Sequence, residues 1–153
     1  MSASADLQQA IASLLGQEGA LRVTIPIVAQ HSKELTAEIE AAAANHGLCV
    51  FVMPPLPVSA LQGNPFVFFD RAEVRVRIIE QPALNTTGAD AYDLIDDVAN
   101  YLHWQPRGED NPLTPILAHP LQLAAHPCKA IEDPRNRIID VIFEAVYGLQ
   151  PPT

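Results

Sequence analysis

The chain has 153 residues, of which 48% are hydrophobic and 18% are charged, and its formal net charge is −9. The hydrophobic fraction is large enough for a folded core and excludes global disorder. The negative charge argues against a nucleic-acid-binding protein, because binding to phosphates needs clustered lysine and arginine side chains.

The N-terminal part of the chain predicts two helices, each followed by a strand. Apolar residues are spaced as on one face of a helix in 6–15 and again in 32–46. Alternating apolar residues in 21–27 predict a half-buried strand, and Pro26 places it at a sheet edge or a strand end, because proline lacks an N–H. The unbroken apolar run 48–53 predicts a strand that is covered on both faces.

A proline-rich arm, residues 54–65, separates this part from the next strand. Its four prolines predict an extended segment without regular structure. The apolar residues that we expect to be exposed on the arm are Leu56, Val58 and Leu61. Residues 66–79 then predict a strand whose apolar and charged side chains alternate between the two faces of the sheet. The charged residues on one face are Glu73, Arg75 and Arg77.

The clearest helix in the sequence is 89–103, because its apolar residues form an unbroken stripe. Thr86 or Thr87 is the expected N-cap. After the helix, residues 106–127 hold five prolines and predict a mostly extended loop, with a short strand over 121–125.

The C-terminal segment, 137–147, fits either a helix or a strand, and its many β-branched residues favour a strand. These elements together predict a single domain over 1–153 that carries the proline-rich arm and the proline-rich loop. The predicted fold class is α+β, with a mixed, largely antiparallel sheet packed against two to three helices.

We predict no catalytic, cofactor-binding or metal-binding residues. The sequence contains no nucleophile elbow, P-loop or dinucleotide-binding motif. The best metal candidates are His119, His126 and Cys128, but their spacing matches no closed zinc site and no fourth ligand is evident. Cys49 and Cys128 are predicted to be free thiols, with Cys49 buried.

Four aspartates on the helix 89–103 have two interpretations. Asp93 and Asp97 lie four residues apart on one helix face, so with Asp90 and Asp96 they could hold Mg²⁺ or act in acid–base chemistry. We favour a solvated acidic face, because no basic or histidine partner lies within the helix. The same side chains are candidates for pairing with an arginine of a neighbouring subunit.

Apolar residues in the two proline-rich segments are the main candidates for a partner interface. The loop contributes Leu113 and Ile116, besides the three apolar residues of the arm. Long ordered loops in small domains usually have a function, and exposed apolar loops are often covered by a partner. The alternative, that both segments wrap the chain's own core, stays open. The low charge content favours assembly, because assembled subunits hide part of their surface.

Three segments of the chain resemble a known family. They are the strand AEVRVRIIEQ (72–81), the turn PALNTTGAD with the helix after it, and the final segment RNRIIDVIFEAVYG (135–148). With these segments the chain resembles the tail terminators and the minor tail, or tail-completion, proteins of tailed phages and prophages. The resemblance is most specific over residues 72–102.

The resemblance implies a structural protein without catalytic residues or cofactors. Members of that family form six-fold rings at the end of the tail tube. The resemblance therefore implies that this chain is a homo-oligomer and, if it follows the family, a hexameric ring. The implied partners of this ring are tail-tube or head–tail connector proteins. In such a ring, Glu73, Arg75 and Arg77 of one subunit would pair with acidic side chains such as Asp93 and Asp97 of the next.

The expected location is the bacterial host cytoplasm and the virion tail. The first residues lack the pattern of a signal peptide, and prolines interrupt the longest uncharged stretch, 41–69, so we expect no membrane span. Sequence-specific binding to nucleic acid is not expected either. Two other functions stay open: a small-molecule or peptide-binding module with a pocket near His103, Trp104 and His119, and a hydrolase or transferase that uses the aspartates.

Overall fold

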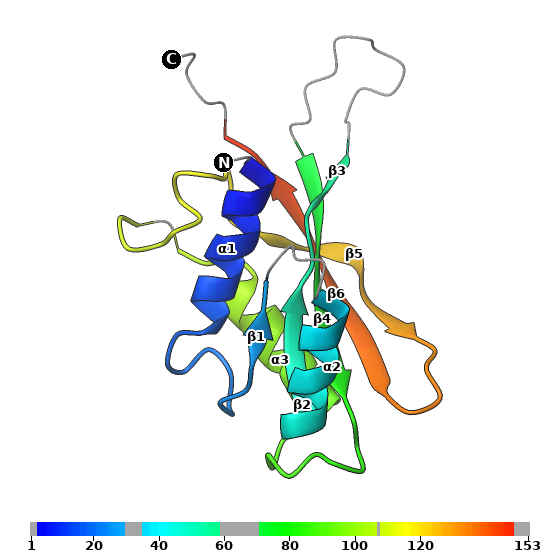
Figure 1. Cartoon of the computed structure of the whole chain (residues 1–153). Helices are drawn as coiled ribbons and strands as arrows, with labels where there is room; N and C mark the ends of the chain where they lie inside the picture. The colour runs from blue at the N-terminus through cyan, green and yellow to red at the C-terminus, as the bar shows by residue number, and fades with distance from the viewer. Residues whose placement is uncertain (1–2, 30–34, 59–70, 107, 149–153) are drawn as a thin grey trace.

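The chain folds into a six-stranded sheet and three helices over the residues that the structure, a computed structural model, describes: 3–29, 35–58, 71–106 and 108–148. In chain order the elements are α1 (Ala3–Leu15), β1 (Ile27–Val28), α2 (Leu35–His46), β2 (Leu48–Val52), β3 (Leu56–Val58), β4 (Arg71–Glu80), α3 (Ala91–Leu102), β5 (Gln122–Ile131) and β6 (Arg137–Val146). Figure 1 shows this arrangement, and the α+β class that the sequence predicts is confirmed.

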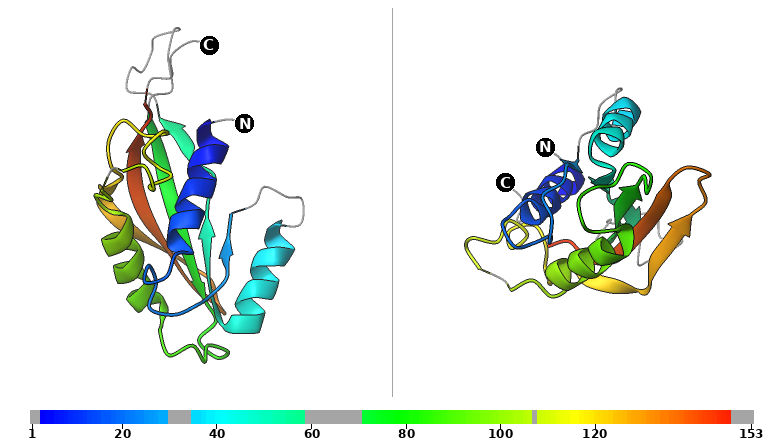
Figure 2. Two further views of the ribbon diagram at one scale, coloured as in Figure 1. Left: turned by 90° about the vertical axis from the view of Figure 1, so that its left-hand side faces the viewer. Right: turned by 90° about the horizontal axis from the view of Figure 1, so that it is seen from below.

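The sheet has the strand order β1-β2-β4-β6-β5, and β3 pairs with the part of β4 that extends beyond β2. Only β1 and β2 are parallel, and all other described neighbours are antiparallel. The sheet is therefore mixed and largely antiparallel, as predicted. Figure 2 shows that α1 and α3 lie on one side of the sheet and α2 on the other.

The main core lies between the sheet and the helices α1 and α3. Side chains alternate along a strand, so every second residue of β2, β4 and β6 points into this core. The sheet contributes Val50, Val76, Ile78, Val141 and Phe143, all fully buried, and the helices contribute Leu7, Ile11, Leu94 and Leu102. Both predicted helical stripes therefore face the same layer of the protein.

A smaller apolar cluster lies under α2, on the opposite face of the sheet. Ala43 of α2 packs there with Cys49 and Ile79 of the strands. Because β2 is covered from both sides, all five of its residues are buried, which confirms the prediction from its unbroken apolar run. The helix ends at His46, and the next residue is Gly47, where φ is +72° and a Cβ would lie 2.4 Å from the backbone of Asn85, so that only glycine fits.

The predicted strand over 21–27 is wrong for most of its length. Only Ile27 and Val28 form β1, which does lie at the sheet edge. The reason is a competing set of contacts: the backbone N–H and the guanidinium of Arg22 both donate to Asp97 of α3. These hydrogen bonds hold the segment against the helix, away from the edge of β2.

The helix α3 begins at a different cap from the one predicted. Asp90, rather than a threonine, is the N-cap, and it forms a capping box in which Asp90 and Asp93 each accept the backbone N–H of the other. Thr87 instead bonds to Asn85 and to the carbonyl of Ala89. The aspartates near the start of this helix therefore have a structural role that their sequence positions allowed but did not single out.

Three strand predictions need comment. The C-terminal segment is a strand, β6, as predicted. The strand predicted over 121–125 is longer in the structure, where β5 continues to Ile131. It includes Pro127, which lacks an N–H for strand pairing. A proline is tolerated there because β5 is an edge strand and its pairing with β6 is irregular between Leu123 and Cys128. The expected lack of regular structure in the arm is wrong at 56–58, where β3 pairs with β4. Leu61 and residues 66–70 lie outside the described residues.

Candidate partner-binding surfaces

The charged side chains of β4 lie on the face of the sheet that α2 covers only at one end. Arg77 donates to both carboxylate oxygens of Asp140 on β6, over 2.8 and 3.1 Å, and Arg75 reaches the same carboxylate over 3.5 Å. Arg75 also donates to Glu73, and this hydrogen bond raises the pKa of the Arg75 guanidinium. Glu73, Arg75 and Arg77 therefore share the predicted face and form, with Asp140, a paired cluster within one chain.

Asp140 is the member of this cluster that the sequence analysis missed. Its side chain is fully buried, while about a quarter of each arginine side chain is exposed. The register places Asp140 directly opposite Arg77, so the two side chains share a face of the sheet. The signal that could have identified Asp140 is an acidic residue with two apolar residues on each side of it in β6. The pairing of these arginines with a neighbouring subunit stays a prediction.

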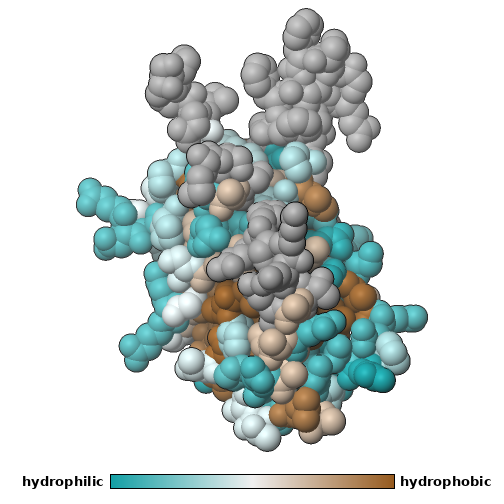
Figure 3. Space-filling model, in the orientation of Figure 1, coloured by the Kyte–Doolittle hydropathy of each residue, from teal (hydrophilic) through white to brown (hydrophobic). Residues whose placement is uncertain are grey.

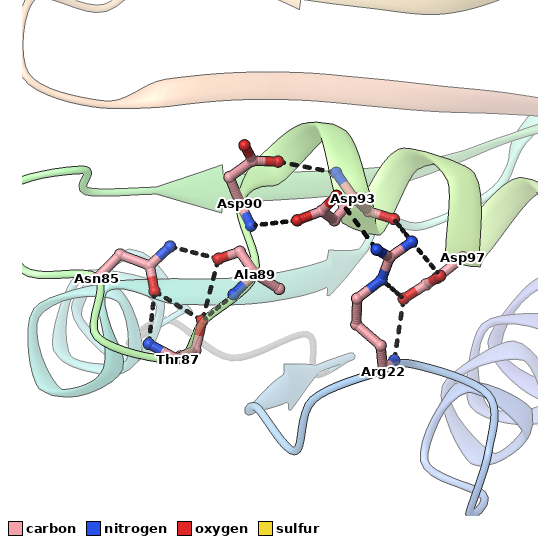
Figure 4. A network of polar contacts seen from close by, with 7 residues as sticks. All are labelled: Arg22, Asn85, Thr87, Ala89, Asp90, Asp93 and Asp97. Carbon is pink, nitrogen blue, oxygen red and sulfur yellow. Dashed lines mark hydrogen bonds and ion pairs between the residues drawn. The ribbon is translucent and has the colours of Figure 1, made fainter.

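The aspartates of α3 bind a basic side chain of their own chain (Figure 4). Arg22 donates to both oxygens of Asp97, over 2.9 and 3.0 Å, and lies 3.2 Å from a carboxylate oxygen of Asp93. The hydrogen bond from Arg22 lowers the pKa of Asp97, and the same bond raises the pKa of Arg22. Asp96 is exposed on the same helix. The predicted acidic face therefore exists, and Arg22 occupies part of it.

The proline-rich loop after α3 packs on its own domain. Leu113 is only 4% exposed, and Leu117 and Leu121 are buried beside it in the main core, with Ile116 packed against them. The expected exposure of Leu113 is wrong, because the turns over 108–117 direct these apolar side chains inward. Of the two interpretations of this loop, packing on the chain's own core is confirmed.

The proline-rich arm behaves differently at its start. Leu56 on β3 is 56% exposed, and it lines an apolar cavity of about 230 Å³ together with Met53, Pro54 and the charged residues Glu73 and Arg75. Val58 ends β3. An apolar side chain beside a cavity, on the part of this sheet face that α2 leaves uncovered, is suited to contact with another protein.

A second cavity, of about 200 Å³, opens beside the first, and we call it the Ile142 cavity. It lies where β5 loses its regular pairing with β6, and it shares Glu73 with the cavity at Leu56. The residues lining it are Arg71, Ala72, Glu73, Ala124, Ile142, Glu144, Ala145 and Val146. Figure 3 shows this side of the molecule, where hydrophilic residues surround separate apolar patches.

The region proposed for a small-molecule pocket is nearly closed. The cavity at His119 has a volume of only about 10 Å³, which is room for one water molecule. His103 uses its Nδ1 atom to accept the backbone N–H of Leu123, 3.0 Å away. Trp104 is 56% exposed, and its ring lies nearly perpendicular to the ring of His103, with 6.0 Å between the ring centroids. This geometry does not favour a ligand pocket between the three residues.

The metal candidates and the cysteines lie apart from these surfaces. His119 lies in the loop, His126 and Cys128 lie on β5, and all three are exposed. Within the described ranges, no group of three or more His, Cys, Asp or Glu residues is arranged to hold a metal ion. Both cysteines are free thiols, as predicted, and burial raises the pKa of Cys49 to about 11.

Comparison with known proteins gives one informative result. A solved structure described as "Virion of native gene transfer agent (GTA) particle" contains a chain that matches this fold with a TM-score of 0.54. The match covers 93% of this chain and 95% of the other, at 19% sequence identity. At this identity the match shows a shared fold. No family model and no curated protein matches the chain.

The helices of the described residues are all too short or too polar to cross a membrane.

Proposed function

We propose that this protein is a structural component of a phage-like virion, and that it assembles with copies of itself into a ring at the end of a tail tube. The observation that carries the proposal is the similarity in fold to a chain of a gene transfer agent virion. That similarity extends over nearly the whole of both chains, so it concerns the architecture of the domain rather than one common motif.

Surface chemistry is consistent with such a role. The face of the sheet that bears Glu73, Arg75 and Arg77 is open beyond α2, and two cavities lined by apolar and charged side chains adjoin it. Contacts of this kind are suited to a subunit interface. The net charge of −9 also suits the inner surface of a ring through which DNA passes, because like charges repel the DNA backbone.

In this proposal the protein works by contact alone, without a reaction of its own. Its partners are further copies of the same chain and the proteins of the tail tube or the head–tail connector. It is made in the bacterial host cytoplasm and ends in the virion tail. The contact between copies is heterologous, because only an interface between two different patches closes into a ring.

Two measurements on the purified chain test the proposal together. Light scattering over a range of concentrations gives the mass in solution, and co-sedimentation with purified tail tubes measures binding to the partner. We expect a mass several times that of one chain, or binding to tubes by a protein that is monomeric without them. A chain that is monomeric at all concentrations and stays in the supernatant with tubes contradicts the proposal.

A further inference from the structure

Two hydrogen bonds close the base of the proline-rich loop between α3 and β5. The backbone N–H of Trp104, just after α3, donates to the carbonyl of Leu121 over 2.9 Å. The backbone N–H of Leu123, at the start of β5, donates to Nδ1 of His103 over 3.0 Å. We call these two bonds the loop-base contact, since together they join the C-terminal end of α3 to the start of β5.

The bond to His103 exists only while its imidazole ring is neutral. A neutral ring has one nitrogen that accepts and one that donates, whereas both nitrogens of the protonated ring carry hydrogen. A proton on Nδ1 therefore places two N–H groups opposite each other where the bond to Leu123 was. Histidine is the side chain that takes up a proton in mildly acidic solution, and the ring of His103 is only partly buried, so water reaches it.

No charged side chain of the described residues forms an ion pair with His103. The charged and histidine side chains on the described parts of α3, the loop and β5 are Asp93, Asp96, Asp97, Glu109, Asp110, His119, His126 and Lys129. Protonation of His103 therefore breaks its bond to Leu123 without separating it from a charged partner in this part of the chain.

Backbone strain at Trp104 favours the opening of the second bond once the first is lost. The φ of Trp104 is +58°, and within the described part of the chain it is the one residue other than glycine with a positive φ. A side chain makes this conformation costly, so it persists only while the surrounding contacts hold it. Without the bond between Leu123 and His103, the bond from Trp104 to Leu121 alone opposes this strain.

The strand β5 is weakly held at the same place. It pairs with β6 at Gln122 and Leu123, and the pairing is then irregular as far as Cys128. Because β5 is also an edge strand, its other side has no neighbouring strand in the described sheet. Segments with few backbone hydrogen bonds open at a lower free energy than the core of a sheet.

A second attachment of the loop does not depend on a side chain that titrates. The backbone N–H of Ala118 donates to the carbonyl of Val146, and that of Gly148 donates to the carbonyl of Ile116. These bonds hold the middle of the loop to the end of β6 through the backbone alone. They should therefore persist in mild acid and limit any opening to the loop-base contact.

We propose that the loop-base contact is a pH-sensitive switch, in which protonation of His103 separates the end of α3 from the start of β5 while the rest of the fold persists. This inference goes beyond the proposed function and does not depend on whether copies of the chain assemble.

Two variants of His103 separate the hydrogen bond from the proton. In His103→Asn the side-chain oxygen is bonded to Cγ, as Nδ1 is, so it can accept the same N–H, but it takes up no proton. In His103→Ala the acceptor is missing at every pH. His126→Asn, at an exposed position of β5, controls for the loss of another histidine.

Amide hydrogen exchange, followed by NMR at about pH 8 and about pH 5, measures the switch. Results are compared as protection factors, which correct for the intrinsic pH dependence of exchange. In the wild type and in His126→Asn, protection of the Leu123 and Trp104 amides should fall in acid by about tenfold, the effect of one lost hydrogen bond. His103→Asn should keep this protection at both pH values, and His103→Ala should lack it at both.

The amides of Ala118 and Gly148 are the reference within the same molecule and should stay protected at both pH values. Equal protection of Leu123 and Trp104 in the wild type at both pH values overturns the inference. So does a loss in acid that is as large in His103→Asn as in the wild type, or one that extends equally to the reference amides. The comparison of the wild type with His103→Asn decides the question even where His103→Ala does not fold.

Discussion

Two clusters of arginine and aspartate use the same chemistry in different surroundings. Arg77 and Asp140 face each other across two strands, and Asp140 is fully buried. Arg22 and Asp97 join a surface segment to α3, and there the arginine is 46% exposed. Both aspartates accept two hydrogen bonds from an arginine side chain, so the number of bonds does not distinguish the clusters.

The difference teaches that burial, rather than hydrogen-bond count, sets what each cluster contributes. Water replaces a lost partner at an exposed site, and exposed ion pairs therefore contribute little. At a buried site the remaining charge has no such replacement. The cluster at Asp140 should accordingly control stability, while the cluster at Asp97 should mainly fix the path of the segment before β1.

The largest effect is expected from Asp140→Ala. This change leaves Arg77 without the carboxylate that it contacts, and the loss in the free energy of unfolding should be about 2–3 kcal/mol, near the lower end for buried pairs because the arginine reaches water. Urea unfolding measures it. Glu144→Ala, at an exposed position of the same strand, is the control. A loss for Asp140→Ala no larger than that of the control contradicts the comparison.

Replacing the whole pair should cost much less than breaking it. In the double variant Arg77→Met with Asp140→Leu, no charge of this pair is left unpaired, and we expect the free energy of unfolding to stay within about 1 kcal/mol of the wild type. The same urea experiment measures it. A double variant as unstable as Asp140→Ala would show that shape, rather than uncompensated charge, controls this site.

The exposed cluster should respond several-fold less than the buried one. Asp97→Asn weakens the contact with Arg22, but water reaches both groups, so the urea midpoint at neutral pH should fall only slightly. Asp96→Asn, at the neighbouring exposed position of α3, is the matched control. If Asp97→Asn lowers the stability to urea as much as Asp140→Ala does, burial does not determine which cluster contributes more to stability.

The smallest expected effect is the pH dependence of the difference in stability between the wild type and Asp97→Asn. Arg22 lowers the pKa of Asp97 in the folded protein, so the contact stabilises the fold above the ordinary aspartate pKa of 3.8. This stabilisation is lost as the pH falls through the lowered pKa. The gap between the wild type and Asp97→Asn should therefore close in acid, and a gap that widens toward low pH would be evidence against the contact.

The sequence predicts the helices and strands of this fold better than it predicts which segments contact each other. The alternation in β4 and the stripe of α3 are strong local patterns, and both are confirmed. The segment 21–27 shows the same alternation, yet Arg22 bonds to Asp97, which lies far away in the sequence. A local pattern cannot reveal such a contact, because side-chain hydrogen bonds can override local preference.

The candidate interface was predictable only in part. The charged face of β4 follows from the two-residue period of a strand, but the burial of Leu113 depends on how a loop with several prolines turns back on the core. Trp104 looks like the end of a helix in the sequence, and its positive φ becomes visible only in three dimensions. The Ile142 cavity depends on a shift in strand pairing that no residue pattern marks.

Electron microscopy of the protein mixed with purified tail tubes tests the central claim most directly. The account predicts a closed ring of density at one end of each tube, absent when the protein is omitted. Tubes with unchanged ends, at protein concentrations well above those of the tubes, would contradict it.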